Sequence, residues 1–331
     1  MGDIVIRGRA APGWEPVRQA FGENFEHGDI GASCAVAVDG ELVVDLWGGH
    51  RDLARTRSWE RDTIVNAWSL TKMLTNTAVL MLADRGALAL DDPVARHWPE
   101  FAAAGKEAVT VRQVMSHTAG LPSFAEPVGD LEVFDWDACC ARLAAQEPDW
   151  TPGDGSGYHA ETQGWLLGEL IRRVDGRTAG RFIGDEIAAV TGADVHVGLA
   201  DRHHARVADV SVLGAATFGA ADDDLTRRQA ASSRRSAGLV NTATWRRAEM
   251  PASNVHTNAR GMVTALAPLA CGGTHPRSGV RLLGPGTLEE IFAVQADGTD
   301  RVLGRRIRFG TGFGLHCDDT PVGVNERTFW W

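Results

Sequence analysis

The sequence predicts an α+β fold in which an antiparallel sheet is flanked by helices, and three observations indicate it. A hairpin opens the chain, because Asp39-Gly40 separates the apolar runs 34–38 and 42–47 and supplies the positive φ angles of a tight turn. The middle of the chain has the apolar spacing of helices. Near the end, glycines within residues 309–316 indicate a strand that approaches other backbone closely.

Length and composition predict a soluble globular protein with a large core. The chain has 331 residues, of which 44% are hydrophobic and 23% are charged, enough for two lobes or one large domain. A formal net charge of -10 without long basic runs argues against a nucleic-acid partner. No apolar stretch reaches membrane-spanning length and the first residues lack the core of a signal peptide, so no membrane partner is expected.

The cysteines favour a reducing, cytoplasmic location. They are odd in number and lack Cys-x-x-Cys spacing, which is typical of buried thiols and not of a disulfide framework or zinc site. The five are Cys34, Cys139, Cys140, Cys271 and Cys317.

The first part of the chain is expected to lead to a serine at the start of a buried helix. Residues 15–25 have the pattern of a short amphipathic helix, and the hairpin follows it. Residues 63–65 then form a short extended piece just before Ser69. The apolar helix after Ser69 stops at Asp84-Arg85-Gly86, where a glycine stands just past its end.

The middle of the chain is predicted to be helical. Thr110 is expected to cap a helix that ends near His117, and Asp135 to cap one that ends at Gln146. Apolar spacing predicts further helices at residues 161–174 and 181–190, and one that ends near residue 271.

Ser69-Leu70-Thr71-Lys72 predicts nucleophilic catalysis. Residues three apart share one helical face, so the Ser69 hydroxyl and the Lys72 amine can meet. A buried lysine loses its proton more easily, and a neutral amine can take the proton from a serine that attacks a carbonyl. Backbone N–H groups at the helix start can hold the developing oxyanion.

Lysine usage supports this interpretation. Of the 33 lysines and arginines only Lys72 and Lys106 are lysines, and arginine cannot serve as a base near neutral pH. The alternative is structural: Lys72 extends its amine out of a core helix and Ser69 caps that helix. Short motifs also match by chance, so both interpretations stay open at this point.

Three segments together resemble a known family. They are the Ser-x-x-Lys helix, Leu90-Asp91-Asp92-Pro93-Val94 and Ser116-His117-Thr118-Ala119-Gly120-Leu121-Pro122, in this order and spacing. They look like the serine β-lactamase-like and penicillin-binding-protein-like superfamily with the class C β-lactamase fold, and resemble most closely its family VIII carboxylesterases. The resemblance extends from the hairpin to Gly314. It implies that Ser69 is the nucleophile and Lys72 the base.

The resemblance also implies a role for Tyr158, the only tyrosine of the chain. The family's second motif begins with a tyrosine after a Pro-Gly pair, here Pro152-Gly153. Its phenol would relay the proton between Ser69, Lys72 and the leaving group, with a pKa lowered by neighbouring positive charge. β-Lactamases of the family usually carry Asn two residues later, where Ala160 stands, which favours an esterase. A loop aromatic that only anchors its lobe is the alternative.

The arrangement implied by the resemblance is an α/β lobe built from both chain ends, with an all-helical lobe inserted. We place the α/β lobe at residues 1–75 and 258–331 and the helical lobe at residues 76–257. In the family, a strand with a Lys-Thr-Gly, His-x-Gly or Trp-Gly-Gly signature, a last strand and a C-terminal helix come next. The chain stops at Phe329-Trp330-Trp331, so we expect these elements, and a second oxyanion N–H, to be missing. The alternative is that the two tryptophans close the site in another way.

Other chemistries find less support. His203-His204, and His159 with Glu161, lack a third ligand at a suitable spacing, so no metal is expected. The glycines near residue 312 precede no helix, unlike a nucleotide-binding loop. No serine has the glycine spacing of the α/β-hydrolase elbow, and no cofactor is implied.

The sequence therefore predicts a serine hydrolase that forms an acyl-enzyme on Ser69. A carboxylesterase for small esters is the first expectation, because the segments that would wall the pocket are rich in Trp and Phe and poor in lysine. A β-lactamase or D-amino-acid peptidase of the same fold is the alternative within this chemistry. A catalytically impaired pseudoenzyme or an assembly protein is the alternative from another class.

Overall fold

The structure is a computed structural model that describes residues 4–211, 224–233, 235–323 and 325–331. Within these ranges the chain forms helices and three small antiparallel sheets, in agreement with the predicted α+β class. None of the helices in the described ranges is long and apolar enough to cross a bilayer.

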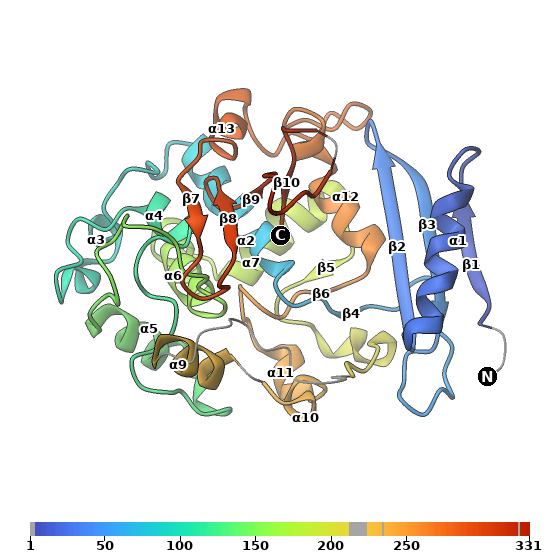
Figure 1. The fold of residues 1–331 in the computed structure, drawn as a ribbon, viewed down its shortest axis with the longest axis horizontal. Coiled ribbons are helices and arrows are strands. Elements are labelled where there is room, and N and C mark those ends of the chain that lie inside the picture. The colour runs from blue at the N-terminus through green and yellow to red at the C-terminus, as the bar shows by residue number, and fades with distance from the viewer. Residues whose placement is uncertain (1–3, 212–223, 234, 324) are drawn as a thin grey trace.

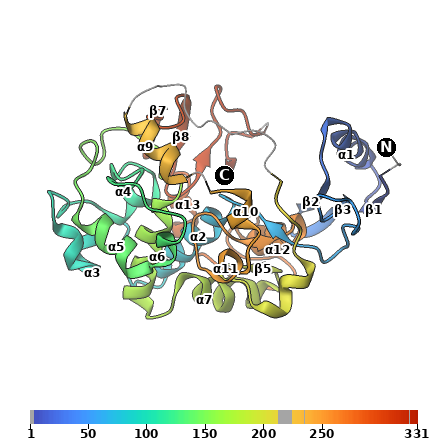
Figure 2. The ribbon, with the colours of Figure 1, turned by 90° about the horizontal axis from the view of Figure 1, so that it is seen from below.

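The N-terminal sheet lies at one end of the molecule, opposite α3 and α5 (Figures 1 and 2). Its strand order is β1-β3-β2, and the strands are β1 (Ile6–Ala10), β2 (Gly31–Val38) and β3 (Glu41–Gly49). The predicted hairpin is confirmed, with φ angles of 50° at Asp39 and 78° at Gly40. Helix α1 (Glu15–Glu23) continues as a 3-10 turn (Asn24–His27), and Phe21 and Phe25 pack with Val44 and Leu46.

A buried helix, α2 (Thr71–Asp84), runs through the middle of the molecule (Figure 1). Leu74, Leu80 and Leu82 belong to the main core, which α2 shares with the helices around it. The helix ends as predicted at Arg85, and Gly86 follows with a φ of 69°. A fully buried helix at the centre gives the residues on its first turn a rigid base.

The helices that surround α2 arise mostly where the sequence predicts them. Thr110 forms a capping box with Gln113, and Asp135 caps α5. The helix after Thr110 ends at Met115, two residues before the predicted His117, whose φ of 61° is left-handed. The helices are α3 (Val94–His97), α4 (Val111–Met115), α5 (Trp136–Ala145), α6 (Thr162–Asp175), α7 (Ala179–Ile183), α8 (Ala189–Thr191), α9 (Asp224–Ser233), α10 (Ala237–Val240) and α11 (Ala243–Arg247).

One predicted helix is interrupted. The region expected as a single helix at residues 181–190 contains a π-helical turn, Gly184–Ala188, between α7 and α8. An inserted turn of this kind leaves the apolar spacing of the sequence largely intact, so the pattern gave no signal for it. Three further 3-10 turns connect helices: Pro99–Ala102, Glu132–Phe134 and Asp201–Arg206.

A small central sheet supports the start of α2. Its order is β4-β6-β5, and the strands are β4 (Val65–Asn66), β5 (Val195–His196) and β6 (His256–Thr257). The Asn66 amide donates to the Ser253 carbonyl at 3.2 Å and accepts from the Trp245 indole at 3.0 Å. Strand β4 is thereby fixed just before the chain turns into α2.

The C-terminal strands form a third sheet with the order β10-β9-β8-β7. Its elements are β7 (Ala296–Thr299), β8 (Arg306–Phe309), β9 (Gly314–Leu315) and β10 (Phe329–Trp330), preceded by α12 (Ala259–Ala270) and α13 (Pro285–Glu290). The prediction of one strand over residues 309–316 is wrong. The chain turns there instead, because Gly310 N–H donates to Phe313 and Gly312 adopts a φ of 86°. The lobe boundaries at residues 75 and 258 stay a prediction.

Replacing Leu80 with alanine is expected to lower the free energy of unfolding by about 2–5 kcal/mol, because truncating a fully buried side chain leaves a cavity. Leu53 is the matched control: its side chain is 55% exposed, and its replacement by alanine should cost less than about 0.5 kcal/mol. Urea unfolding followed by circular dichroism measures both. Equal midpoints for the two variants would contradict the central place of α2 in the core.

Candidate active site

Ser69 lies in the tight turn between β4 and α2. The preceding residue, Trp68, has a φ of 48°, an uncommon conformation for a bulky residue that the surrounding contacts maintain. The Thr71 hydroxyl donates to the Trp68 carbonyl at 2.5 Å and accepts from the Val255 N–H at 2.9 Å. The residue at the N-cap of α2 is Leu70, and the Ser69 side chain makes no capping bond. The alternative in which Ser69 only caps the helix is therefore wrong.

Lys72 stands one turn further along α2 with its amine enclosed. The residue is 1% exposed, so the alternative of a lysine that reaches out to solvent is also wrong. Its Nζ donates to the Ala160 carbonyl at 2.5 Å and to the Ala252 carbonyl at 2.9 Å, and lies 3.4 Å from the Ser69 Oγ. Burial lowers the pKa of Lys72 to about 7, although the nearby Glu161 carboxylate acts to raise it.

Either protonation state of Lys72 can make the contacts of its amine. A neutral amine has two N–H groups and one lone pair, whereas an ammonium group has three N–H groups and no acceptor. The carbonyls of Ala160 and Ala252 take two N–H groups. In the neutral form the lone pair is then available to the Ser69 hydroxyl, whereas in the ammonium form the third N–H donates to the Ser69 Oγ.

Tyr158 completes this group, since its OH lies 2.6 Å from the Ser69 Oγ. The prediction that its pKa is lowered is wrong: burial raises the pKa of Tyr158 to about 12, and the hydrogen bond to Ser69 opposes only part of that rise. Desolvation is the largest cause, and the carboxylates of Asp300 and Glu161 also act to raise this pKa. Tyr158 is therefore a protonated phenol at neutral pH.

Trp331, one of the two tryptophans considered as closing the site, contacts the far side of Tyr158. The indole Nε1 donates to the Tyr158 OH at 3.2 Å, and the two ring centroids are 4.8 Å apart. An indole N–H can only donate, so the Tyr158 hydroxyl accepts from Trp331. The Ser69 Oγ lies between the Tyr158 hydroxyl and the Lys72 amine.

Asp300 fixes the loop that carries Tyr158. Its buried carboxylate accepts from the Tyr158 N–H at 3.0 Å and the Ser156 hydroxyl at 2.9 Å. It also accepts from the N–H groups of Val302 and Leu303 in its own loop, at 3.0 and 2.9 Å. Because the partners are 142 residues apart in sequence, no local pattern pointed to this contact.

Two buried histidines stand behind Tyr158 and shape the same loop. His159 Nδ1 contacts the Gly157 carbonyl at 2.6 Å while its Nε2 accepts from the Leu121 N–H at 3.0 Å, so the ring proton is on Nδ1. Burial lowers the pKa of His159 to about 3 and that of His117 well below its usual value. Both rings are neutral and act as structural acceptors.

A buried ion pair lies next to Lys72. Glu161 follows Ala160, and its carboxylate contacts Arg235 with Nη2 to Oε2 at 2.7 Å and Nε to Oε1 at 3.3 Å. The two side chains are 7% and 1% exposed. The sequence pointed to Glu161 only as a doubtful metal ligand. Within the described ranges, no group of three or more His, Cys, Asp or Glu side chains is arranged to hold a metal ion.

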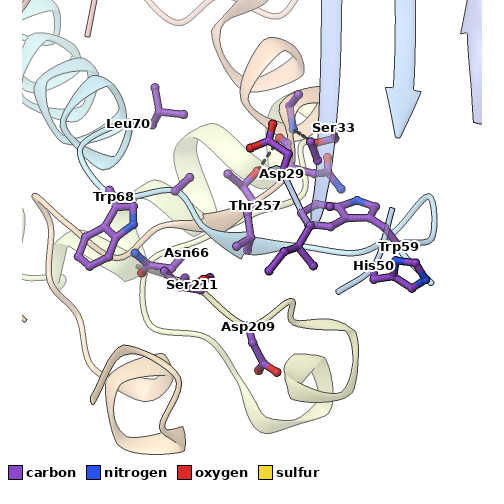
Figure 3. Close-up of a pocket in the computed structure, with 18 of the residues that line it drawn as sticks. Asp29, Ser33, His50, Trp59, Asn66, Trp68, Leu70, Asp209, Ser211 and Thr257 are labelled. Carbon is purple, nitrogen blue, oxygen red and sulfur yellow. Dashed lines mark hydrogen bonds between the residues drawn. The ribbon is translucent and has the colours of Figure 1, made fainter. Parts of the chain in front are cut away.

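A cavity of about 450 Å³ adjoins the turn before Ser69 (Figure 3). Figure 3 shows Trp68 and Asn66 on one side of it and Trp59 and His50 on another. The residues that line it include none of Ser69, Lys72 and Tyr158. We therefore assign this cavity no part in the chemistry of the three residues.

Curated relatives match part of the chain. It is 38% identical over 195 residues to "Esterase/beta-lactamase LipL" of Mycobacterium tuberculosis, a match that covers 58% of this chain and 45% of that protein. It is 33% identical over 165 residues to "Esterase EstB" of Burkholderia gladioli, covering 45% of this chain and 42% of that protein. The matched part is thus less than half the length of each of these relatives.

Solved structures match a larger share of this chain than the curated relatives do. A penicillin-binding protein homolog from Caulobacter crescentus superimposes with a TM-score of 0.91 at 38% identity, and a family VIII carboxylesterase with 0.89 at 38% identity. Each match covers 98% of this chain and 87% of the other. The family described as Beta-lactamase matches residues 11–331. With nearly its whole length matched, the chain belongs to the beta-lactamase family.

Proposed function

We propose that the protein is a serine hydrolase, and most specifically a carboxylesterase that acts on small esters through an acyl-enzyme on Ser69. One observation carries the proposal: the Ser69 Oγ lies 2.6 Å from the Tyr158 OH and 3.4 Å from the amine of a buried lysine. A serine hydroxyl is a weak nucleophile until an adjacent base takes its proton. Lys72, with a pKa of about 7, is that base.

In the proposed mechanism, neutral Lys72 takes the proton of Ser69 while the Ser69 Oγ bonds to the ester carbonyl carbon. The backbone N–H of Ser69 donates to the oxyanion of the tetrahedral intermediate. Tyr158 donates its phenol proton to the leaving oxygen, the carbon–oxygen bond breaks, and the proton taken by Lys72 returns to Tyr158. Water then attacks the acyl-enzyme by the same proton transfers in reverse, which releases the acid and restores Ser69.

Ester substrates are favoured over lactams by two considerations. Relatives named as esterases and a family VIII carboxylesterase are 33–38% identical to this chain. Ala160 also stands where the β-lactamases that the sequence resembles carry Asn, so no amide side chain is present there to bind a lactam substituent. β-Lactams and D-amino-acid peptides remain the second candidate, because one relative is named as both esterase and β-lactamase and a structural neighbour as a penicillin-binding protein homolog.

A cytoplasmic location without a nucleic-acid partner belongs to the same proposal. Its support is the five cysteines, none of which forms a disulfide, and the net charge of -10. Burial raises the pKa of the Cys139 thiol to about 11, which keeps this side chain unreactive.

Replacing Ser69 with alanine is expected to lower the kcat/KM for p-nitrophenyl esters more than about a thousandfold, because the nucleophile is lost. Ser58, an exposed serine, gives the control variant Ser58→Ala, which should retain full activity. Initial rates of nitrophenol release measure both. Equal loss in the two variants, or hydrolysis that survives in Ser69→Ala, would contradict the assignment of the nucleophile.

The kcat/KM of the wild-type protein should rise with pH through a midpoint near 7. The sign follows from Lys72: its pKa is lowered to about 7, and the active form is the neutral one present above that pH. Lys72→Arg should remove the activity at every pH, because arginine stays protonated. A profile measured between pH 5 and pH 9 that is flat, without a midpoint near 7, would argue against lysine as the base.

Tyr158 is expected to stay protonated up to at least pH 10, because burial raises its pKa to about 12. The chain has one tyrosine, so a protein labelled with ¹³C at the tyrosine ζ carbon gives a single assignable signal. Its chemical shift should remain that of a phenol from pH 6 to pH 10. Movement of the signal toward the phenolate value near neutral pH would show instead that Tyr158 serves as the base.

A further inference from the structure

We propose that Glu161 and Arg235 are positioning residues that act together on Lys72: Glu161 holds the Ala160 carbonyl against the amine, and Arg235 limits the charge that Glu161 presents to it. The proposal rests on the function proposed above for Lys72. Neither residue touches the reacting atoms, so their effect would appear in the protonation of the base and not in the identity of the nucleophile.

The backbone connection is direct. Ala160 gives Lys72 its shortest hydrogen bond, 2.5 Å from Nζ to the carbonyl oxygen, and Glu161 is the next residue. The Glu161 side chain is held by two hydrogen bonds from Arg235. Arg235 reaches further, to the Val128 carbonyl at 3.4 Å and the Asp130 carboxylate at 3.3 Å. The guanidinium therefore ties the peptide next to Lys72 to the segment around residue 129.

The charges near Lys72 are few among the described residues. Ser69 and Tyr158 are neutral, and the buried rings of His117 and His159 are neutral as well. The Glu161 carboxylate is the charge that acts on Lys72, and it favours the ammonium form. An ammonium cannot accept the serine proton, so an uncompensated carboxylate at this place would oppose catalysis.

Arg235 compensates that carboxylate. Glu161 faces Arg235, Lys72 and Asp130: burial raises the pKa of Glu161, while Arg235 and Lys72 act to lower it. A guanidinium in bidentate contact with the carboxylate reduces the field of that carboxylate at Lys72. The two members of the pair thus push the pKa of Lys72 in opposite directions, which distinguishes this role from a purely structural one.

Two substitutions test the proposal through the acid limb of the kcat/KM profile. Glu161→Gln removes the carboxylate and should lower the midpoint by about one pH unit. Arg235→Gln leaves the Glu161 carboxylate without its compensating positive charge and should raise the midpoint by about the same amount. Arg235→Lys keeps the positive charge and should restore the wild-type midpoint. Arg202→Gln, a change at an exposed arginine, is the matched control and should leave the profile unmoved.

A second readout needs no activity. Because Lys72 and Lys106 are the only lysines, a protein grown with labelled lysine gives two side-chain signals, and the one absent from Lys72→Arg belongs to Lys72. The titration midpoint of the Lys72 signal should fall in Glu161→Gln and rise in Arg235→Gln. Should the wild-type protein hydrolyse no ester, the proposed function fails, while this titration still decides the role of the pair.

Shifts of equal sign in both single variants, or an unmoved Lys72 titration in folded protein, would overturn the proposal. If one single variant does not fold, the double variant Glu161→Gln with Arg235→Gln decides, because it leaves neither member of the pair as an unpaired buried charge. It should titrate below the wild type, since the carboxylate is gone. A double variant that titrates like the wild type would overturn the proposal as well.

Discussion

The burial of one amine, that of Lys72, is the constraint on which the rest of the site depends. A lysine in water keeps its proton far above neutral pH, and removing water from around it makes the charged form costly. The fold supplies that burial and then two carbonyls, from Ala160 and Ala252, that accept the N–H groups of the neutral form. A lysine placed one turn after Ser69 but open to solvent would remain an ammonium and could not serve as a base.

The groups that surround Lys72 come from distant parts of the chain, and each is fixed by contacts of its own. Asp300 and Trp331 hold Tyr158 from two sides, through its backbone and its hydroxyl. The central sheet and the unusual backbone at Trp68 orient Ser69. Such preorganisation is what allows a weak nucleophile to react.

Much of this arrangement could be predicted because its signals are local. The spacing of Ser69 and Lys72, the Asp39-Gly40 turn and the caps at Thr110 and Asp135 each depend on residues within a few positions of one another. The contacts of Asp300 and Arg235 depend on tertiary structure, and nothing near them in sequence marked them. The two C-terminal tryptophans drew notice in the sequence, but the contact of Trp331 with the Tyr158 hydroxyl did not. The direction of the Tyr158 pKa was predicted wrongly for the same reason: a lowered value assumes that neighbouring positive charge outweighs burial, whereas burial of the phenol is the largest cause of the shift.

The central claim is that the structure activates Ser69 as a nucleophile, and the intact mass of the protein after incubation with an activated phosphonate ester tests it most directly. The account predicts one adduct per chain, mapped to the peptide that contains Ser69, absent from Ser69→Ala and formed faster above pH 7 than below it. A folded protein that gains no adduct, or gains it at another residue, would contradict the account and leave a protein that keeps the family's fold without its chemistry.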